Sequence, residues 1–257
     1  MSVRQSVTKD SLQVRIHASR QAVGESAAAD AGNTLRNLLQ QRDTVHMIFA
    51  AAPSQNEFLA ALRREPDIDW HRVRAFHMDE YVGLSPDAPQ RFGNYLKTHI
   101  FDRLPFLSIN YLNPDSPDGT AAECSRYTAL LQRYPADIVC MGIGENGHVA
   151  FNDPHVADFN DPVWVKQVEL DMACRHQQVN DGCFATLDDV PTHALTLTIP
   201  VLMRASRLFC MVPGPTKARA VWHTLHDAIS EHIPATCLRL HPYATLYVDT
   251  DSAPANG

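Results

Sequence analysis

This sequence of 257 residues has no long apolar run, no excess of positive charge and no closely spaced cysteine pair. A membrane-spanning helix needs about 18 or more consecutive apolar residues, whereas the apolar run at 138–141 already ends at Gly142. The 22 Lys and Arg residues are outnumbered by 29 Asp and Glu residues, for a formal net charge of −7. The lack of a long apolar run predicts that the chain does not bind a membrane. Proteins that bind nucleic acids usually carry surplus basic residues, so we expect no nucleic acid as a partner.

The N-terminal segment and the cysteines also lack particular signals. Residues 1–20 contain no apolar signal-peptide core and no lipidation motif, so we expect a cytoplasmic protein. The six cysteines form no CxxC pair, which predicts reduced thiols rather than a redox motif or a cysteine-rich zinc site. His223 and His226 lack an acidic partner in a known ligand pattern, so we expect no metal site.

The chain does contain a repeated alternation of short apolar segments, turns and amphipathic segments, which predicts βαβ units in one domain spanning 1–257. Residues 153–191 have poor periodicity and many polar side chains, which favours a cover or lid segment. The expected strands lie near 44–49, 72–76, 138–141, 194–198, 208–212 and 244–248. The expected helices lie near 19–42, 54–64, 92–101, 120–133 and 216–228.

Four loops follow predicted strands at their carboxyl ends. In open parallel sheets, ligands bind outside these ends, so we expect the four loops to share one site. The loops are residues 51–54, 79–81, 142–153 and 212–217.

The loop GIGENGHVAFNDP at 142–154 combines three glycines with a histidine and a carboxylate. Glycines permit positive φ angles and a close approach of the backbone to a ligand. The spacing matches GxGxxG, but neither a following helix nor a later acidic residue completes a dinucleotide site. A histidine in such a turn is more often bonded to backbone groups, although the surroundings of His148 favour a chemical role.

Two other segments carry candidate groups. Asp79 and Glu80 follow an apolar strand, where mutual repulsion and partial burial raise the pKa of one carboxyl, as a proton-abstracting base requires. A solvated acidic turn would explain the same pair. The segment VPGPTK at 212–217 leads into a helix, where free amides and Lys217 suit an anion, although an ordinary helix start is the simpler alternative.

Together these segments resemble the glucosamine-6-phosphate deaminase (isomerase) family of aldose–ketose enzymes. FHMDEYVGL at 76–84 is similar to the family's Phe-Asn-Met-Asp-Glu-Tyr-Val-Gly-Leu, and the loop at 142–154 to its Gly-x-Gly-x-Asp-Gly-His-Ile-Ala-Phe-Asn-Glu-Pro. Order and spacing agree, and weaker matches extend the resemblance from about residue 44 to 249. The resemblance implies a three-layer α/β/α fold with a Rossmann-like, mostly parallel sheet.

The resemblance also implies roles for single residues. Asp79 would be the base that moves a proton between C2 and C1 of the open-chain sugar, and His148 would open the pyranose ring. Asp153 takes the position of a glutamate that supports this histidine, and Asn146 lies beside the histidine in the same loop. Lys217 would contact the substrate phosphate. Further substrate-binding residues implied in this way are Ala52, Ser54, Glu80 and Gly144. The implied partner is a small sugar or sugar phosphate, with no metal or organic cofactor.

The sequence departs from the family pattern at several places. AAPSQ at 51–55 replaces a Thr-Gly-Ser-Thr-Pro type phosphate loop and loses a glycine, a hydroxyl and an amide donor, so only Ser54 keeps a hydroxyl. The family arginine expected near Asp181 is missing, so a 6-phosphate need not be the anchor. Asn146 replaces an aspartate and Asp153 a glutamate, which predicts an altered pH dependence. The C-terminal extension that carries part of an allosteric site in some members is absent, so we expect no such regulation.

We therefore expect a deaminase/isomerase that converts glucosamine 6-phosphate, or a related hexosamine with different anchoring, into the ketose and ammonia. Two alternatives stay open: a 6-phosphogluconolactonase-like hydrolase, which needs the histidine but not Asp79, and a non-catalytic sugar-phosphate sensor. The segments at 79–81 and 151–153 favour the deaminase. The sequence leaves open the hexosamine epimer and whether the protein forms a homo-oligomer.

Overall fold

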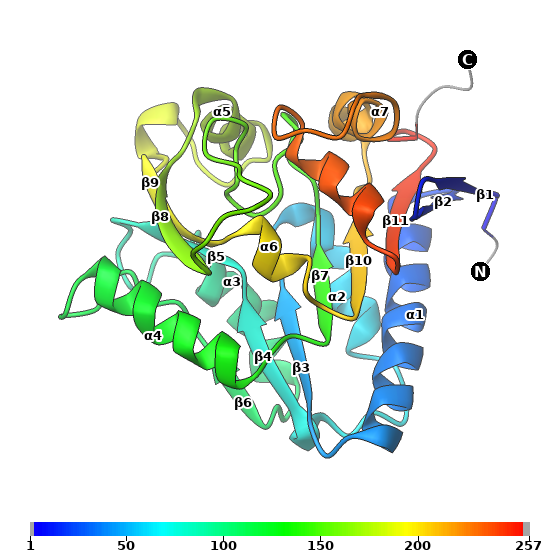
Figure 1. The fold of residues 1–257 in the computed structure, drawn as a ribbon, viewed down its shortest axis with the longest axis horizontal. Helices are drawn as coiled ribbons and strands as arrows, with labels where there is room; N and C mark the ends of the chain where they lie inside the picture. Colours follow the sequence, from blue (N-terminus) through cyan, green and yellow to red (C-terminus); the bar gives the residue numbers. More distant parts are fainter. Residues whose placement is uncertain (1–2, 254–257) are drawn as a thin grey trace.

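The computed structural model describes residues 3–253, which form a large and a small β-sheet surrounded by helices (Figure 1). The large sheet has eight strands in the order β1-β2-β11-β10-β7-β3-β4-β6. Its neighbouring strands are parallel except for the β1–β2 hairpin. The small sheet is antiparallel, with the order β5-β9-β8.

The strands are β1 (Gln5–Lys9), β2 (Leu12–His17), β3 (Val45–Phe49), β4 (Val73–His77), β5 (Asp79–Val82), β6 (Ser108–Asn110), β7 (Ile138–Met141), β8 (Val165–Glu169), β9 (His193–Leu197), β10 (Arg207–Met211) and β11 (Ala244–Asp249). The α-helices are α1 (Arg20–Gln41), α2 (Asn56–Leu62), α3 (Phe92–His99), α4 (Thr120–Arg133), α5 (Met172–Asn180), α6 (Ile199–Leu202) and α7 (Ala218–His226).

Helices cover both faces of the large sheet because its central strands are apolar on both sides. In β3, Met47 and Phe49 belong to the apolar cluster that includes α1 and α2. Ile48, between them, belongs to the opposite cluster, which includes Tyr127 of α4 and Val221 of α7. Successive side chains of a strand point to opposite faces, so one strand contributes to two cores. The predicted three-layer α/β/α fold with a mostly parallel sheet is confirmed.

Local sequence signals located most of these elements. Ser19 caps α1, since its side chain accepts a hydrogen bond from the Ala22 amide at 3.3 Å. Strand β7 and helix α4 have the predicted bounds. The β1–β2 hairpin was not predicted, although Leu12, Val14 and Ile16 alternate with polar residues as a half-buried strand requires.

Two predicted irregular segments are in fact regular. Residues 79–81, predicted as a loop, lie in β5, which pairs with β9. Tyr81 is fully buried there and packs against the rings of Phe92, Phe151 and Phe184, which explains why the chain continues as a strand. The predicted cover segment, 153–191, contains β8 and α5. Its function as a lid stays a prediction.

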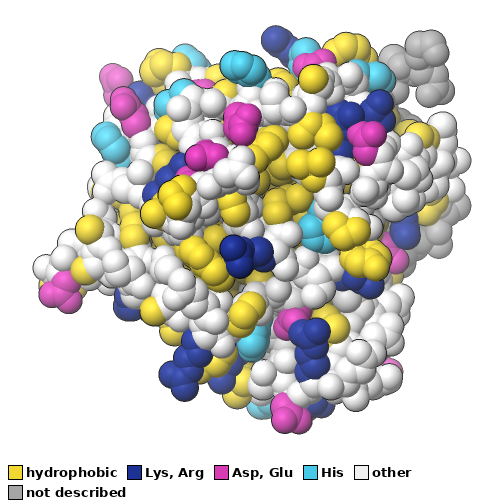
Figure 2. Space-filling model, viewed as in Figure 1, with side chains coloured by type: hydrophobic (Ala, Val, Ile, Leu, Met, Phe, Trp, Pro, Cys, Tyr) yellow, Lys and Arg dark blue, Asp and Glu magenta, His cyan; other side chains and the backbone are white. Residues whose placement is uncertain are grey.

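The surface carries charges of both signs, and the cysteine thiols are unpaired. On the face shown in Figure 2, Lys and Arg side chains are interspersed with Asp and Glu. Within residues 3–253, no helix has the length and apolar character needed to cross a membrane. All six cysteines are free, and burial raises the pKa of the Cys140 and Cys210 thiols.

Candidate active site

A cavity open to solvent lies at the carboxyl ends of β3, β4, β7 and β10. Each of the four predicted loops lines it, which agrees with the rule for ligand sites in open parallel sheets. From these loops come Ala52, Ser54, Asp79, Gly144, His148 and Lys217. Helix α5 and the residue after it add Gln177, Gln178 and Asp181.

Asp79 lies where the chain passes from the large sheet to the small one. Strand β4 ends at His77, and the Met78 carbonyl accepts a hydrogen bond from the Leu197 amide at 2.8 Å, which holds the connection in place. The Asp79 side chain lines the cavity, although the residue is only 6% exposed. Burial, and then the neighbouring charge of Glu80, raises its pKa well above the ordinary value. Asp79 is therefore a stronger base than a solvated aspartate.

Glu80 was expected to bind substrate, but it does not line this cavity. Its carboxylate accepts hydrogen bonds from the amides of Tyr81, Phe92 and Gly93 at 2.9 to 3.0 Å. Burial raises its pKa to about 7, although these bonds and Arg91 oppose the shift. Because β-strand side chains alternate, Asp79 and Glu80 point in opposite directions. Glu80 thus joins the start of α3 to β5, behind Asp79.

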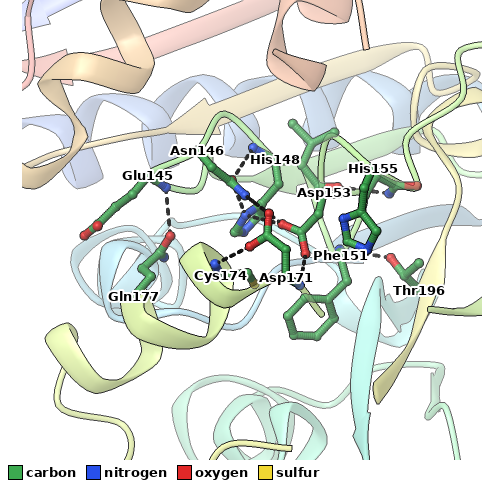
Figure 3. Close-up of polar contacts among 12 residues, drawn as sticks. Glu145, Asn146, His148, Phe151, Asp153, His155, Asp171, Cys174, Gln177 and Thr196 are labelled. Carbon is green, nitrogen blue, oxygen red and sulfur yellow. Dashed lines mark hydrogen bonds and ion pairs between the residues drawn. The ribbon is translucent and has the colours of Figure 1, made fainter. Parts of the chain in front are cut away.

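His148 is held by two side chains of its own loop (Figure 3). Its Nδ1 atom lies 2.7 Å from Oδ1 of Asn146 and 3.1 Å from Oδ1 of Asp153. Asn146 donates from Nδ2 to Asp153 and to Asp171, at 3.0 Å each, so its Oδ1 must accept. This network assigns the ring proton to Nδ1 and leaves Nε2 as an acceptor.

Gly144 provides the space that the His148 ring occupies. A Cβ atom at this position would lie 2.1 Å from Cε1 of His148, far inside van der Waals contact. The ring therefore packs directly on the glycine backbone, where no other residue fits without moving it. Gly144, the second glycine of the loop, is thus needed because a side chain at this position would overlap the His148 ring.

Asp153 supplies a buried negative charge next to His148. Burial by itself would raise its pKa, but hydrogen bonds from His148, Asn146 and the Asp171 amide hold the pKa below the ordinary value. The fully buried group therefore stays ionised. Ligand atoms of His148, Asp153 and Cys174 also lie within 4.8 Å of one another, close enough to hold a metal ion. The hydrogen bonds satisfy Asp153 without one.

Helix α5 is tied to the histidine loop at two points. Asp171 caps α5 by accepting from the Cys174 amide at 2.6 Å, and the same carboxylate accepts from Asn146. The Glu145 amide donates to Oε1 of Gln177 at 2.8 Å (Figure 3). Neither Gln177 nor Gln178 was predicted from the sequence, because no motif marks them. Their only signal was a position inside the predicted cover segment.

Lys217 is the one lysine or arginine among the described residues that line this cavity. It is 5% exposed and forms no ion pair within the described chain. Burial lowers its pKa, whereas the charges of Asp181 and Glu145 oppose the shift. In the segment 212–217, where free amides were expected at the helix start, the Gly214 amide donates to the buried carboxylate of Asp249 at 3.0 Å.

Residues 18–247 match the family described as glucosamine-6-phosphate isomerases/6-phosphogluconolactonase. The chain belongs to this family. Glucosamine-6-phosphate deaminase from Bacillus thuringiensis is 34% identical over 225 residues, which are 87% of this chain and 83% of the relative. The enzyme of the same name from an Exiguobacterium species is 34% identical over 190 residues, 74% of this chain and 72% of the relative. The resemblance seen in the two long motifs is confirmed.

Solved structures of the glucosamine-6-phosphate isomerase/6-phosphogluconolactonase family have the same fold. A monomeric glucosamine-6-phosphate deaminase superposes with a TM-score of 0.83 and 28% identity, covering 93% of this chain and 98% of its own. The 6-phosphogluconolactonase from Thermotoga maritima superposes with a TM-score of 0.74 and 17% identity, covering 92% and 99%. The family thus includes two reactions on one fold. The reaction of this chain must therefore be inferred from the residues that line its cavity.

Proposed function

We propose that this protein is a deaminase/isomerase of a 2-amino sugar, acting on glucosamine 6-phosphate or on a related hexosamine with different anchoring. The observation that carries the proposal is the position of Asp79, a buried base that lines the same cavity as His148, the ring that Asp153 contacts. Proton transfer between neighbouring carbons requires a base of this kind, since a carbon acid needs a strong, positioned acceptor.

Ring opening is the first task, and His148 is suited to it. With a proton on Nδ1, the Nε2 atom can take the proton of the C1 hydroxyl and return it to the ring oxygen as the C1–O5 bond breaks. The buried charge of Asp153 stabilises the ring while it carries both protons. The product of this step is an open-chain aldehyde.

Proton transfer from C2 to C1 is the second task. The aldehyde makes the C2 hydrogen acidic, and Asp79 can remove it and deliver it to C1. A proton of the amino group passes to O1 in the same conversion, so the products are an alcohol at C1 and an imine at C2. Water adds to the imine and ammonia leaves, so one hexosamine and one water give one ketose and one ammonia. Lys217 and Ser54 are the groups of the cavity that would bind the substrate hydroxyls or phosphate.

A lactone hydrolase would use this cavity differently. Hydrolysis needs the histidine to activate water, but no proton is removed from a carbon atom. Asp79 would therefore be dispensable. A sugar sensor would bind its ligand without turnover. Variants at position 79 therefore separate the hydrolase from the deaminase, and the presence or absence of turnover separates the sensor from both.

The decisive assay is ammonia release from glucosamine 6-phosphate, galactosamine 6-phosphate and free glucosamine, with 6-phosphogluconolactone hydrolysis measured in parallel. Ammonia from any of the hexosamines, lost in Asp79→Asn, supports the proposal. Lactone hydrolysis that Asp79→Asn retains would replace it with the hydrolase. Binding of a hexosamine by calorimetry without turnover would replace it with the sensor.

A further inference from the structure

Asp79 and Glu80 are adjacent carboxylates that face two different cavities. Asp79 lines the candidate active site. Glu80 lines a second cavity, the rear cavity, together with Arg91, Asn94 and Lys97 and with residues that follow β6. The alternation of side chains along β5 separates the two carboxylates. The fold therefore places one of them toward the reacting atoms and the other behind it.

Glu80 anchors the start of α3, whose first ring forms a wall of the active site. Its carboxylate accepts hydrogen bonds from the amides of Phe92 and Gly93, the first two residues of α3, which have no partner within the helix. Arg91, which precedes the helix, provides no side-chain cap. The Phe92 ring lines the active-site cavity and stacks on Phe151, with ring centroids 5.5 Å apart. Glu80 thus joins the strand of the base to a wall of the same cavity.

The surroundings of the two carboxyl groups assign the negative charge to Glu80 first. Three backbone amides donate to Glu80, and Arg91 acts on it electrostatically. No group of the described chain donates a hydrogen bond to the Asp79 side chain. Hydrogen bonds and positive charges favour an ionised carboxyl. Glu80 therefore loses its proton before Asp79 does, and its charge adds to the effect of burial in raising the pKa of Asp79.

The other groups around Glu80 leave this charge in place. The ionisable residues that face it are Asp79, Arg91, Lys97 and Tyr111. Arg91 is itself paired with Asp115, and Lys97 is exposed, so solvent screens its charge. Burial raises the pKa of Tyr111, which stays neutral. Across the small sheet, Glu80 lies opposite an apolar side chain of β9.

We propose that Glu80 is a positioning residue of the reaction, which acts through Asp79. It holds β5 against α3 and places a negative charge behind the base, so that Asp79 accepts a proton from carbon more readily than an isolated aspartate does. The inference rests on the proposed function for the role of Asp79 as the base. A residue that only capped α3 would stabilise the fold and leave the titration of Asp79 unchanged.

The pH dependence of kcat/KM for ammonia release from glucosamine 6-phosphate separates these two roles. Glu80→Gln removes the charge, so the acid limb, which reports the ionisation of Asp79 in the free enzyme, should move to lower pH by about one unit or more. Glu80→Asp keeps the charge on a shorter side chain, so it should lose turnover while the limb stays in place. An unmoved limb in Glu80→Gln, or equal movement in both variants, would overturn the inference.

The matched control is Glu123→Gln. Glu123 is also buried, and it accepts a hydrogen bond from a backbone amide, that of Asn113, at 2.6 Å. It belongs to α4 and does not line the active-site cavity. Urea unfolding should show a loss of stability in both Glu→Gln variants, whereas only Glu80→Gln should move the acid limb. Equal movement of the limb in the control would show a general effect of lost stability and overturn the inference.

Carbon-13 NMR of the aspartate carboxyl groups measures the pKa of Asp79 without turnover. The Asp79 resonance is the one missing from Asp79→Asn. In the wild type it should titrate well above the ordinary value of about 4, and in Glu80→Gln at a pH lower by about one unit or more. Should Glu80→Gln not fold, the wild-type resonance alone decides: it should shift in two steps, the first as Glu80 ionises at about pH 7. A single step at the ordinary value would overturn the inference.

These measurements also distinguish the inference from the proposed reaction. Ammonia release together with an Asp79 resonance that Glu80→Gln does not move would overturn the inference alone. A moved resonance with no ammonia from any hexosamine would support the coupling of Glu80 to Asp79 and overturn the reaction.

Discussion

His148 and Asp153 lie 3.1 Å apart, measured from Nδ1 to Oδ1, in the candidate active site. Asn146 contacts both, since its Oδ1 accepts a hydrogen bond from Nδ1 of the ring while its Nδ2 donates to the carboxylate. The Nδ1 hydrogen of His148 thus faces both a neutral amide and a carboxylate.

Asp79→Asn should lower kcat for ammonia release by about 10²- to 10⁴-fold, the usual contribution of a positioned general base. The amide preserves the shape of the side chain but cannot accept the C2 proton. Asp87→Asn, an exposed change nearby, is the control and should leave turnover unchanged. Full activity in Asp79→Asn would remove the assigned role.

The same substitution should alter the pH dependence of stability. The folded-state pKa of Asp79 is raised, so the native state retains a proton that the unfolded state has lost above about pH 4. The free energy of unfolding therefore falls as pH rises toward the folded-state pKa. Urea unfolding should give equal stability for wild type and Asp79→Asn at pH 4, and at pH 8 a variant more stable by about 1 kcal/mol or more. A wild type that is the more stable of the two at pH 8 would contradict this.

Asn146→Asp should destabilise the protein by about 1–3 kcal/mol at pH 8, because two donated hydrogen bonds are replaced by carboxylate repulsion. The partners that lose a donor are Asp153 and Asp171. The loss should shrink as pH falls and the new carboxyl gains a proton. Urea unfolding at pH 8 and pH 5 measures it, with exposed Asn160→Asp as the control. A loss independent of pH would exclude charge repulsion as the cause.

Gly144→Ala should reduce kcat by about tenfold or more, since the new methyl group displaces the His148 ring. Overpacking costs about 1–3 kcal/mol, so the variant should still fold. Gly32→Ala is the control, because the atoms nearest to its Cβ belong to the flexible side chain of Glu65. Equal loss of turnover in both variants would show a general packing defect instead of a displaced histidine.

Lys217→Met should bind substrate less well but fold more stably. Loss of a charged hydrogen bond predicts a kcat/KM lower by about 10- to 100-fold. The ammonium is buried without an ion pair and its pKa is lowered, so its removal should raise the free energy of unfolding by about 1 kcal/mol at pH 7. Steady-state kinetics and urea unfolding measure both, with exposed Lys97→Met as the control. A less stable variant would show that the ammonium is satisfied in the folded state.

Local patterns account for the parts of this protein that were predicted correctly. The Ser19 cap, the bounds of β7 and α4, and the gathering of loops at the carboxyl edge of the sheet depend on residues close in sequence or on a general rule of parallel sheets. The two long motifs identified the family because they preserve residue types at set spacings.

Contacts between distant segments decided the rest. Strand β5 exists because β9, more than 100 residues later, pairs with it, and this pairing turns Asp79 into the cavity and Glu80 away from it. Folding also brings together the acidic neighbours of Lys217 and the side chains that tie helix α5 to the histidine loop. The sequence by itself determined which groups are present and which family they resemble. Only the tertiary structure decided which face each group points to, because burial and long-range pairing are properties of the whole chain.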